Sequence, residues 1–374
     1  MPGLLPNIDP NGLLEYSVVY TDRSLNHMSS AFQKAMNDVS SSLKEVYNAE
    51  SVVLVPGGGT YGMEAVARQF ATDKDCLVIR NGWFSYRWSQ IFEMGNIPSK
   101  LTVLKASRKI DGAQEPFAPV DIDLAVEKIK TEKPAMVFAP HVETSSGIIL
   151  PDEYIRSISE AIHSVGGMFV LDCIASGAIW VDMEKCGVDV LVSAPQKGWS
   201  ASPAFGMVML SKNAAEKIKD TQSTSFSCDL LKWLQIMRAY ENGGHAYHAT
   251  MPTDAIKHFR DTINETAEFG FDRARDKQQE LGDRVRELLH KHNFISVAAE
   301  GFHAPGVVVS YTNDKAIHNG SKFKDMGIQI AAGVPLQCDE GDDYQTFRLG
   351  LFGLDKLKNV DAAVQKLEDA FNKL

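Results

Sequence analysis

The sequence predicts an α/β protein built around a mostly parallel sheet of seven strands, followed by a small α+β domain. Short apolar runs alternate with helical patterns through roughly the first 255 residues, as expected when helices cover both faces of a parallel sheet. A charged, helix-favouring stretch and shorter apolar runs follow. With 374 residues and a mass of 41.2 kDa, the chain can form one large and one smaller domain.

Each expected strand is a nearly continuous apolar run. A strand that is buried on both faces needs no polar alternation, so such runs favour a parallel sheet whose two faces are covered by helices. We expect the carboxyl ends of these strands to line the functional site. The runs are SVVLV (51–55), CLVIR (76–80), LTVLK (101–105), AMVFA (135–139), MFVLD (168–172), VDVLVS (188–193) and GMVML (206–210).

Helical periodicity is clearest in residues 151–166, where apolar side chains recur on one helical face and Pro151 suits the first turn. Towards the C-terminus, residues 261–292 favour a helix, and an amphipathic helix begins at about Asn359. The runs VVVSY, IQIAA and TFRLG lie between them and predict the strands of the small domain. We therefore expect an N-terminal arm at 1–13, a large domain at 14–256 and a small domain at 257–374.

Composition and charge exclude several function classes. The net charge of −10 and the pI near 5.5 argue against binding to nucleic acid or to an anionic membrane surface. No apolar run is long enough for a membrane span, and the start MPGLLPNIDPNG does not resemble a signal peptide. The five cysteines are scattered and form no C-x-x-C pair, which favours a cytoplasmic protein without a cysteine metal cluster.

The stretch LVPGGGTYGMEA predicts a phosphate site between a strand and a helix. Gly57, Gly59 and Gly62 match the G-x-G-x-x-G spacing of dinucleotide-binding folds, and backbone N–H groups at a helix N-terminus bind phosphate. A dinucleotide site also needs an acidic residue at the end of the second strand, where this chain has Arg80 and Asn81. A single phosphate therefore fits better, although a plain strand-to-helix turn has the same pattern.

Two residues at neighbouring strand ends indicate which phosphate this is. Asp172 ends the strand MFVLD, and Lys197 follows 25 residues later, just past the next strand. Pyridoxal phosphate needs a lysine that forms a Schiff base with its aldehyde and a carboxylate that keeps its pyridine nitrogen protonated. A lysine in a solvated loop would usually be a simple surface charge, but small residues surround Lys197.

At this point the sequence resembles the class V aminotransferases. These are fold-type I pyridoxal-phosphate enzymes that include alanine/serine–glyoxylate and 2-aminoethylphosphonate–pyruvate aminotransferases. The resemblance runs from about residue 50 to the C-terminus, where FRLGLFG is similar to the segment with the substrate-binding arginine. The blocks that carry it, in order, are LVPGGGTYGMEA, NGWFSYRW, HVETSSG, VLDCIASG, SAPQKGW and YHATMP.

The resemblance implies a role for each residue of the site. Lys197 would form the Schiff base and move the proton, and Arg348 would bind the substrate α-carboxylate. Tyr247 and Thr250 would reach the cofactor phosphate of a neighbouring subunit, which implies a homodimer with composite sites. The other cofactor contacts would be Gly58, Gly59, Thr60 and Gln196 at the phosphate, Phe84 (or Trp83) and Ile174 on the ring faces, Thr144 near the phenolic oxygen with Glu143 in support, and Asp172 at the ring nitrogen.

The chain departs from the family pattern in two places. Gly58 occupies a position that is commonly serine, so phosphate binding would depend more on backbone amides. The N-terminal segment does not match the family's usual T-P-G-P-like start, which leaves the substrate side of the pocket open. Arg23 or His27 would contact substrate there or be solvated.

The implied function is ping-pong transamination between a small amino acid and a 2-oxo acid such as glyoxylate or pyruvate. An alternative is cysteine desulfuration or β-lyase chemistry, in which Cys338 would be the nucleophile. Acidic neighbours, Asp339 and Glu340, would raise its pKa and weaken it. A non-catalytic sensor that binds the cofactor is a third possibility, but it would not need Asp172, Lys197 and Arg348 together.

Overall fold

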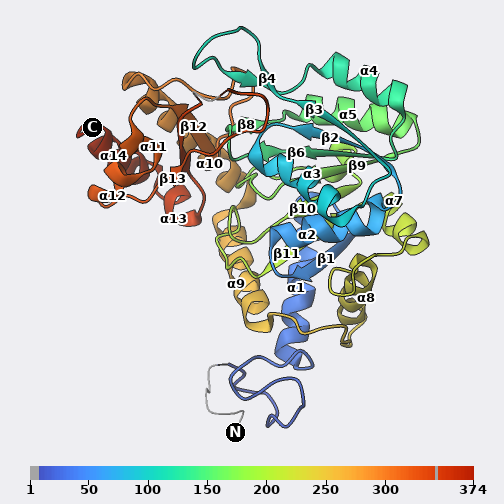
Figure 1. Cartoon of the computed structure of the whole chain (residues 1–374). Helices are drawn as coiled ribbons and strands as arrows, with labels where there is room; N and C mark the ends of the chain where they lie inside the picture. Colours follow the sequence, from blue (N-terminus) through green and yellow to red (C-terminus); the bar gives the residue numbers. More distant parts are fainter. Residues whose placement is uncertain (1–7, 342–343) are drawn as a thin grey trace.

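A mostly parallel sheet forms the centre of the molecule (Figure 1). The computed structural model describes residues 8–341 and 344–374, so residues 1–7 of the expected arm lie outside the described residues. In the described part the largest sheet has seven strands, and all seven apolar runs are confirmed as its strands. Their order is β1 (Ser51–Pro56), β11 (Phe205–Leu210), β10 (Val190–Ser193), β9 (Met168–Asp172), β6 (Met136–Pro140), β2 (Asp75–Arg80) and β3 (Lys100–Lys105).

Strand direction divides this sheet into two parts. β11 runs antiparallel to both of its neighbours, β1 and β10. The neighbouring pairs from β10 to β3 are all parallel. The carboxyl ends of β2, β6, β9 and β10 therefore meet at one edge of the sheet, where an α/β fold places its ligands.

Helices pack around the sheet because its strands are apolar on both faces. α2 packs on β10 and β11, α3 on β2 and β6, and α5 on β9. Pro151 is the N-cap of α5, one residue before the first turn in which the sequence places it. The helices of this part are α1 (Ser30–Tyr47), α2 (Gly59–Val66), the π-helical turn η1 (Ala67–Ala71), α3 (Trp83–Gly95), α4 (Ile122–Glu132), α5 (Asp152–Ser164), α6 (Met183–Cys186), α7 (Lys212–Lys217), the 3₁₀ turn η2 (Ile218–Asp220), α8 (Leu230–Glu241) and α9 (Thr253–Phe269).

The C-terminal part forms a separate layer beside the carboxyl edge of the large sheet (orange and red in Figure 1). Its antiparallel sheet has the order β12 (Val307–Tyr311), β14 (Thr346–Gly350), β13 (Ala331–Ala332). Only the last two residues of the run IQIAA are paired in it. The helices here are α10 (Phe271–Lys291), α11 (Lys315–His318), α12 (Ser321–Asp325), α13 (Leu354–Leu357) and α14 (Val360–Phe371). Two short hairpins, β4 (Ser107–Arg108) with β5 (Phe117–Ala118) and β7 (Val142–Glu143) with β8 (Ile148–Ile149), complete the strands.

The charged stretch 261–292 is two helices rather than one. α9 ends and α10 begins at Gly270, whose φ of 96° is strained for residues with a side chain. The two helices also belong to different cores. Ile256, Phe259 and Ile263 of α9 are buried with the large sheet, whereas Ala274 of α10 and the apolar residues after it form a second core. We therefore propose a domain boundary near Gly270 instead of residue 257.

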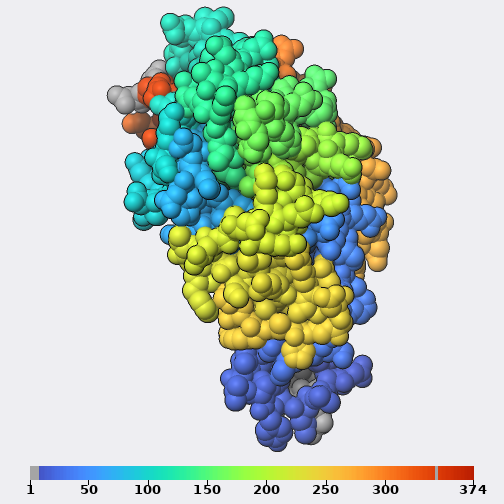
Figure 2. Space-filling model, turned by 90° about the vertical axis from the view of Figure 1, so that its right-hand side faces the viewer, coloured from blue at the N-terminus to red at the C-terminus, as the bar shows by residue number. Residues whose placement is uncertain are grey.

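Two further observations concern the whole described chain. No helix in it has the length and apolar character that a membrane span requires. The five cysteines, all within the described residues, are free and buried. Residues 8–29 form an irregular arm that protrudes from one end of the molecule, and Figure 2 shows it (dark blue) beyond the yellow helices.

Candidate active site

Asp172 is the last residue of β9 and lies at the carboxyl edge of the sheet. Its side chain is buried, one carboxylate oxygen accepts a hydrogen bond from Ile174 N (3.0 Å), and it forms no ion pair with a described residue. Burial raises the pKa of Asp172 to about 7, and the negative charge of Glu143 raises it further. A buried carboxyl group without a cationic partner is costly, so this position suits a ligand that brings a positive charge.

Lys197 lies in the turn that follows β10, beside the same edge. Its Nζ is 5.3 Å from the centre of the Phe352 ring, and it has no hydrogen bond or ion pair among the described residues. Burial lowers the pKa of the Lys197 ammonium group, and the positive charge of Arg348 lowers it further. Both effects favour the neutral amine, which is the nucleophilic form.

The glycine-rich loop ends at the start of α2. Gly57 has a φ of 126°, and a Cβ at Gly59 would lie 2.7 Å from Ile174 Cδ1, so both positions require glycine. The N–H groups of Gly58, Gly59 and Thr60 have no acceptor within the described chain. They form an open set of donors at a helix N-terminus, as the sequence predicts for a phosphate site.

Arg87 adds a positive charge to this loop and is absent from the residues that the sequence predicts. Its Nη1 donates to Thr60 Oγ1 (3.2 Å), and its guanidinium lies 5.3 Å from the Phe84 ring. The charge of Arg87 also lowers the pKa of Asp172 slightly against the larger effect of burial. Its place in the NGWFSYRW block is the signal that could have identified it.

Glu143 fixes the first turn of α3. Its carboxylate is fully buried and accepts hydrogen bonds from the backbone N–H groups of Phe84 (3.1 Å) and Ser85 (2.8 Å) and from the hydroxyl of Ser145 (2.8 Å). A carboxylate at a helix N-terminus is favourable because the free N–H groups and the helix dipole attract negative charge. Glu143 therefore holds Phe84 in one orientation.

Phe84 rather than Trp83 lies beside Arg348, the residue that is expected to bind the substrate carboxylate. The guanidinium of Arg348 lies 5.6 Å from the Phe84 ring, whereas the Trp83 ring packs 5.8 Å from Tyr86. This arrangement favours Phe84 as the ring that would stack on a planar ligand.

Arg348 reaches the site from β14 of the C-terminal sheet. Its Nε donates to Ala332 O (2.7 Å), which leaves the rest of the guanidinium without an ion pair among the described residues. Burial lowers the pKa of Arg348, while the charge of Glu143 opposes that shift. The group stays cationic and can take a carboxylate in a bidentate contact.

Three further residues at this edge are buried or half-buried. Thr144 is buried between β7 and β8, and Gln196 has a buried Oε1 without a hydrogen-bond partner. His141 was not among the predicted residues, although it begins the HVETSSG block. Its Nδ1 is 2.7 Å from Ser176 Oγ, its N–H donates to Asp172 O, and burial lowers its pKa to about 4, so it is neutral at pH 7.

Tyr247 and Thr250 do not lie with the other residues in the single chain. They are exposed in the loop between α8 and α9, where their hydroxyl oxygens are 3.2 Å apart. No contact within the described residues joins them to Asp172, Lys197 or the glycine loop. Contacts within the single chain join Lys197 to Arg348, Arg348 to Phe84, and Ile174 to Asp172 and to Gly59.

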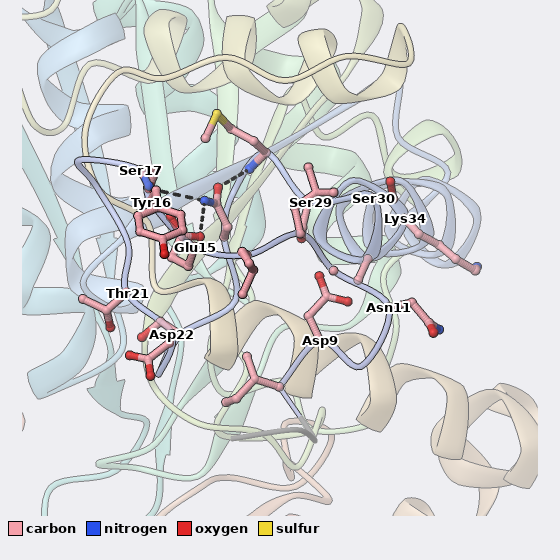
Figure 3. Close-up of a pocket in the computed structure, with 18 residues that line it drawn as sticks. Asp9, Asn11, Glu15, Tyr16, Ser17, Thr21, Asp22, Ser29, Ser30 and Lys34 are labelled. Carbon is pink, nitrogen blue, oxygen red and sulfur yellow. Dashed lines mark hydrogen bonds between the residues drawn. The ribbon is translucent and has the colours of Figure 1, made fainter. Parts of the chain in front are cut away.

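Two hollows lined by described residues lie away from this edge. One of about 830 Å³ lies within the N-terminal arm and is lined by residues between 8 and 34 (Figure 3). Another of about 560 Å³ lies between α10 and β12. Neither contains Asp172, Lys197 or Arg348. We locate the site by its unpaired charges and free donors because cavity size alone carries no chemistry.

Comparisons with known proteins show the family of this chain. A family model described as aminotransferase class-V matches residues 13–338. The alanine–glyoxylate aminotransferase 1 of Saccharomyces cerevisiae is 26% identical over 350 residues, which cover 88% of this chain and 86% of that protein. The 2-aminoethylphosphonate–pyruvate transaminase of Syntrophobacter fumaroxidans is 26% identical over 328 residues (86% and 82%). The crystal structure of an alanine–glyoxylate aminotransferase from Nostoc sp. has a TM-score of 0.76 at 21% identity and covers 92% of this chain and 88% of that one.

The raised pKa of Asp172 predicts a pH-dependent stability in the cofactor-free protein. In the folded state the carboxyl group of Asp172 keeps its proton up to about pH 7, whereas in the unfolded chain it releases the proton near pH 4. The free energy of unfolding should therefore fall as pH rises between these values, by up to a few kcal/mol. Asp172→Asn should lack this contribution. Urea unfolding of both proteins from pH 5 to 8 measures the difference.

The exposed Asp123→Asn variant is the control and should follow the wild type at every pH. If the curves for wild type and Asp172→Asn stay parallel over this range, the carboxyl group is ionised throughout and the burial argument is wrong.

Proposed function

The chain belongs to the class V aminotransferases, and we propose that it transfers an amino group from a small amino acid, such as alanine or serine, to a 2-oxo acid such as glyoxylate or pyruvate. Members of this family use pyridoxal 5'-phosphate, and the architecture is that of a fold-type I enzyme. The observation that carries the proposal is the convergence of three unpaired groups, Asp172, Lys197 and Arg348, at one edge of the sheet.

The residues of this edge fit the cofactor. The free N–H groups of Gly58, Gly59 and Thr60 suit its phosphate, to which the side-chain amide of Gln196 would also donate. Asp172 would meet the pyridine nitrogen. The remaining contacts that we propose are Phe84 and Ile174 on the two ring faces and Thr144 near the phenolic oxygen.

The chemistry would be divided between the cofactor and the protein. When bound, pyridoxal phosphate supplies an electron sink for the bond that breaks at the substrate α-carbon. Asp172 would keep the pyridine nitrogen protonated. Lys197 would take the proton from the substrate α-carbon as a general base and deliver it, as a general acid, to the C4′ carbon of the cofactor. The lowered pKa of the Lys197 ammonium group suits it both to accept and to donate this proton.

Arg348 would orient the substrate by its carboxylate. A guanidinium donates two parallel hydrogen bonds to a carboxylate, which fixes direction as well as position. Glu143 supports this geometry because it orients Phe84, on whose ring the guanidinium lies. Both amino acid and 2-oxo acid carry the same carboxylate, so one arginine would serve both half-reactions.

We propose that the enzyme works as a cytoplasmic homodimer. Tyr247 and Thr250 are exposed in the single chain and lie away from Lys197, as expected if they serve the phosphate of a second subunit. The five free, buried cysteines suit a reducing compartment.

The buried state of Cys338 argues against the desulfurase alternative. Its Sγ lies 3.5 Å from Arg80 O, and Glu340 accepts a hydrogen bond from its N–H. Burial, rather than the acidic sequence neighbours alone, raises the pKa of Cys338 to about 12, and Glu143 and Glu340 add to the shift. Asp339 instead pairs with Lys105. A desulfurase needs a mobile thiolate, whereas Cys338 is buried and its thiol is not easily ionised.

The proposed activity can be tested by absorbance. The protein with bound pyridoxal phosphate should show a visible band that one amino donor bleaches and that glyoxylate or pyruvate restores. Alanine, serine, aspartate and 2-aminoethylphosphonate are the donors to compare. Initial rates should give the parallel lines of ping-pong kinetics, since the donor leaves before the acceptor binds.

Two variants control this experiment. Lys197→Ala should abolish turnover, and Cys338→Ala should leave it unchanged. A band that responds only to cysteine, with sulfide release that Cys338→Ala abolishes, would favour the desulfurase instead.

Replacing Arg348 with Ala should weaken substrate use without loss of cofactor. Hydrogen bonds to charged groups contribute about 1.5–3 kcal/mol, so we expect KM for the amino acid to rise roughly 10- to 100-fold. The visible absorbance of the bound cofactor should persist. Arg284→Ala, which removes an exposed ion pair with Asp361, is the matched control and should not change KM. Loss of cofactor from Arg348→Ala would contradict the assigned role.

The composite site predicts recovery of activity when two defective subunits are mixed. A Lys197→Ala subunit supplies Tyr247 and Thr250, and a Tyr247→Phe/Thr250→Val subunit supplies Lys197. Each mixed dimer would then contain one intact site, so an equimolar mixture should reach about a quarter of wild-type activity. The assay is turnover after subunit exchange.

The control mixes Lys197→Ala with Arg348→Ala. These two residues would belong to the same site of one chain, so the mixture should give no gain over Arg348→Ala alone. Absence of recovery in the first mixture would show that Tyr247 and Thr250 do not act across subunits.

A further inference from the structure

The hollow of about 560 Å³ in the C-terminal part lies between the end of α10 and β12 (Figure 1). Its volume is within the range of sites that enclose a small organic molecule. Its lining combines apolar side chains with one permanent cation, Arg286, and contains no carboxylate among the described residues. The apolar side chains are Leu289, Phe294, Ile295 and Val308. This lining suits a molecule that has an apolar body and one negative charge.

The guanidinium of Arg286 is not neutralised by a described residue. Its Nη2 donates to the backbone oxygens of Ala304 (2.6 Å) and Val307 (3.4 Å), whereas Nη1 is buried and has no hydrogen-bond partner. Asp283, one turn away on α10, is exposed and accepts a hydrogen bond from Gln279 instead. Burial lowers the pKa of Arg286 to about 10, so the group stays cationic at pH 7. A half-buried cation without a counter-ion is destabilising, and an anionic ligand would offset that cost.

The other ionisable side chains near the hollow leave Arg286 as its main charge. His303 lines the hollow, and burial together with the charge of Arg286 lowers its pKa, so its ring is neutral at pH 7. The Nε2 of His303 donates to Ala298 O (3.1 Å). Glu300 acts on His303 only through its charge, because it is exposed and does not line the hollow. Ser310, on β12, adds a hydroxyl group to the lining.

Hydrogen bonds fix the loop 302–304, which forms one side of the hollow. This loop is joined to the β7–β8 hairpin, because Ile149 N donates to Phe302 O (2.9 Å) and Ala304 N donates to Gly147 O (2.9 Å). A site whose walls are held in place before binding loses little conformational entropy when a ligand enters. The hollow is therefore preformed.

We propose that this hollow binds a small organic carboxylate with an aromatic or branched apolar body. The carboxylate would pair with Arg286, and the apolar body would pack between Leu289 and Phe294. One guanidinium balances one carboxylate, and no second cation of permanent charge lines the hollow among the described residues. None of the three unpaired groups of the candidate active site lines it either, so this is a separate site.

The test measures binding of phenylacetate to the full-length protein with bound cofactor, by saturation-transfer difference NMR. Every protein carries Arg348→Ala, so that the expected substrate-binding arginine does not hold the probe. The protein with this change alone is the parent. Phenylacetamide, which has the same shape without the charge, is the second probe.

Two pairs of variants are compared with this parent. Arg286→Gln removes the charge of the hollow, and Arg284→Gln is its matched control, because Arg284 pairs with Asp361 and does not line the hollow. Ile295→Glu adds a negative charge to the lining, and Ile295→Gln is its neutral counterpart. The side chain of Ile295 is 47% exposed, so neither change disturbs the core. Circular dichroism checks that each variant folds.

We expect Arg286→Gln and Ile295→Glu to raise the dissociation constant of phenylacetate at least about tenfold, while both controls match the parent. Phenylacetamide should bind the parent at least about tenfold more weakly than phenylacetate does. The inference is overturned by equal affinity within either pair of variants or for the two probes. Absence of phenylacetate binding to the parent at about 10 mM would overturn it as well. If Arg286→Gln does not fold, the two Ile295 variants decide the question.

Discussion

The carboxylate of Glu143 is the group on which the site depends most. It is buried at the end of a hairpin and is stabilised by N–H groups of α3 and by the hydroxyls of Ser85 and Ser145. These hydrogen bonds join the HVETSSG and NGWFSYRW segments, which are about 60 residues apart in the chain. Its charge also acts beyond these contacts, because it raises the pKa of Asp172 and helps keep Arg348 protonated. One buried carboxylate thus fixes the backbone at Phe84 and contributes to the pKa of two neighbours, in which burial is the larger effect.

The charged side chains around Glu143 do not pair with one another and remain available to a ligand. Asp172, Lys197 and Arg348 form no ion pairs with the described residues, and burial moves the pKa of each toward its neutral form. Unpaired buried charges are destabilising. A ring nitrogen, an aldehyde and a carboxylate would offset these costs, and pyridoxal phosphate with an amino acid substrate brings all three. The N–H groups of the glycine loop likewise lack acceptors within the described residues, and a phosphate would supply them.

The single chain is also incomplete at its surface. Tyr247 and Thr250 lie apart from the site, and the arm that packs on Tyr247 presents apolar side chains to water. In the homodimer that we propose, a second subunit would receive the two hydroxyl groups. Assembly and cofactor binding would then be linked, because the same loop takes part in both.

The sequence by itself determined the sheet and the ends of its strands. Runs such as MFVLD are apolar on both faces and therefore favour strands that helices cover, which predicts that Asp172 and Lys197 lie at the carboxyl edge. The equally apolar run SVVLV is nevertheless the edge strand β1. Tertiary structure alone decided the break between α9 and α10 at Gly270, the contacts of Arg87 and the burial of Cys338. It also decided that Phe84 rather than Trp83 faces Arg348. Local periodicity reports which faces of an element are buried, but these features arise from contacts between segments far apart in the chain.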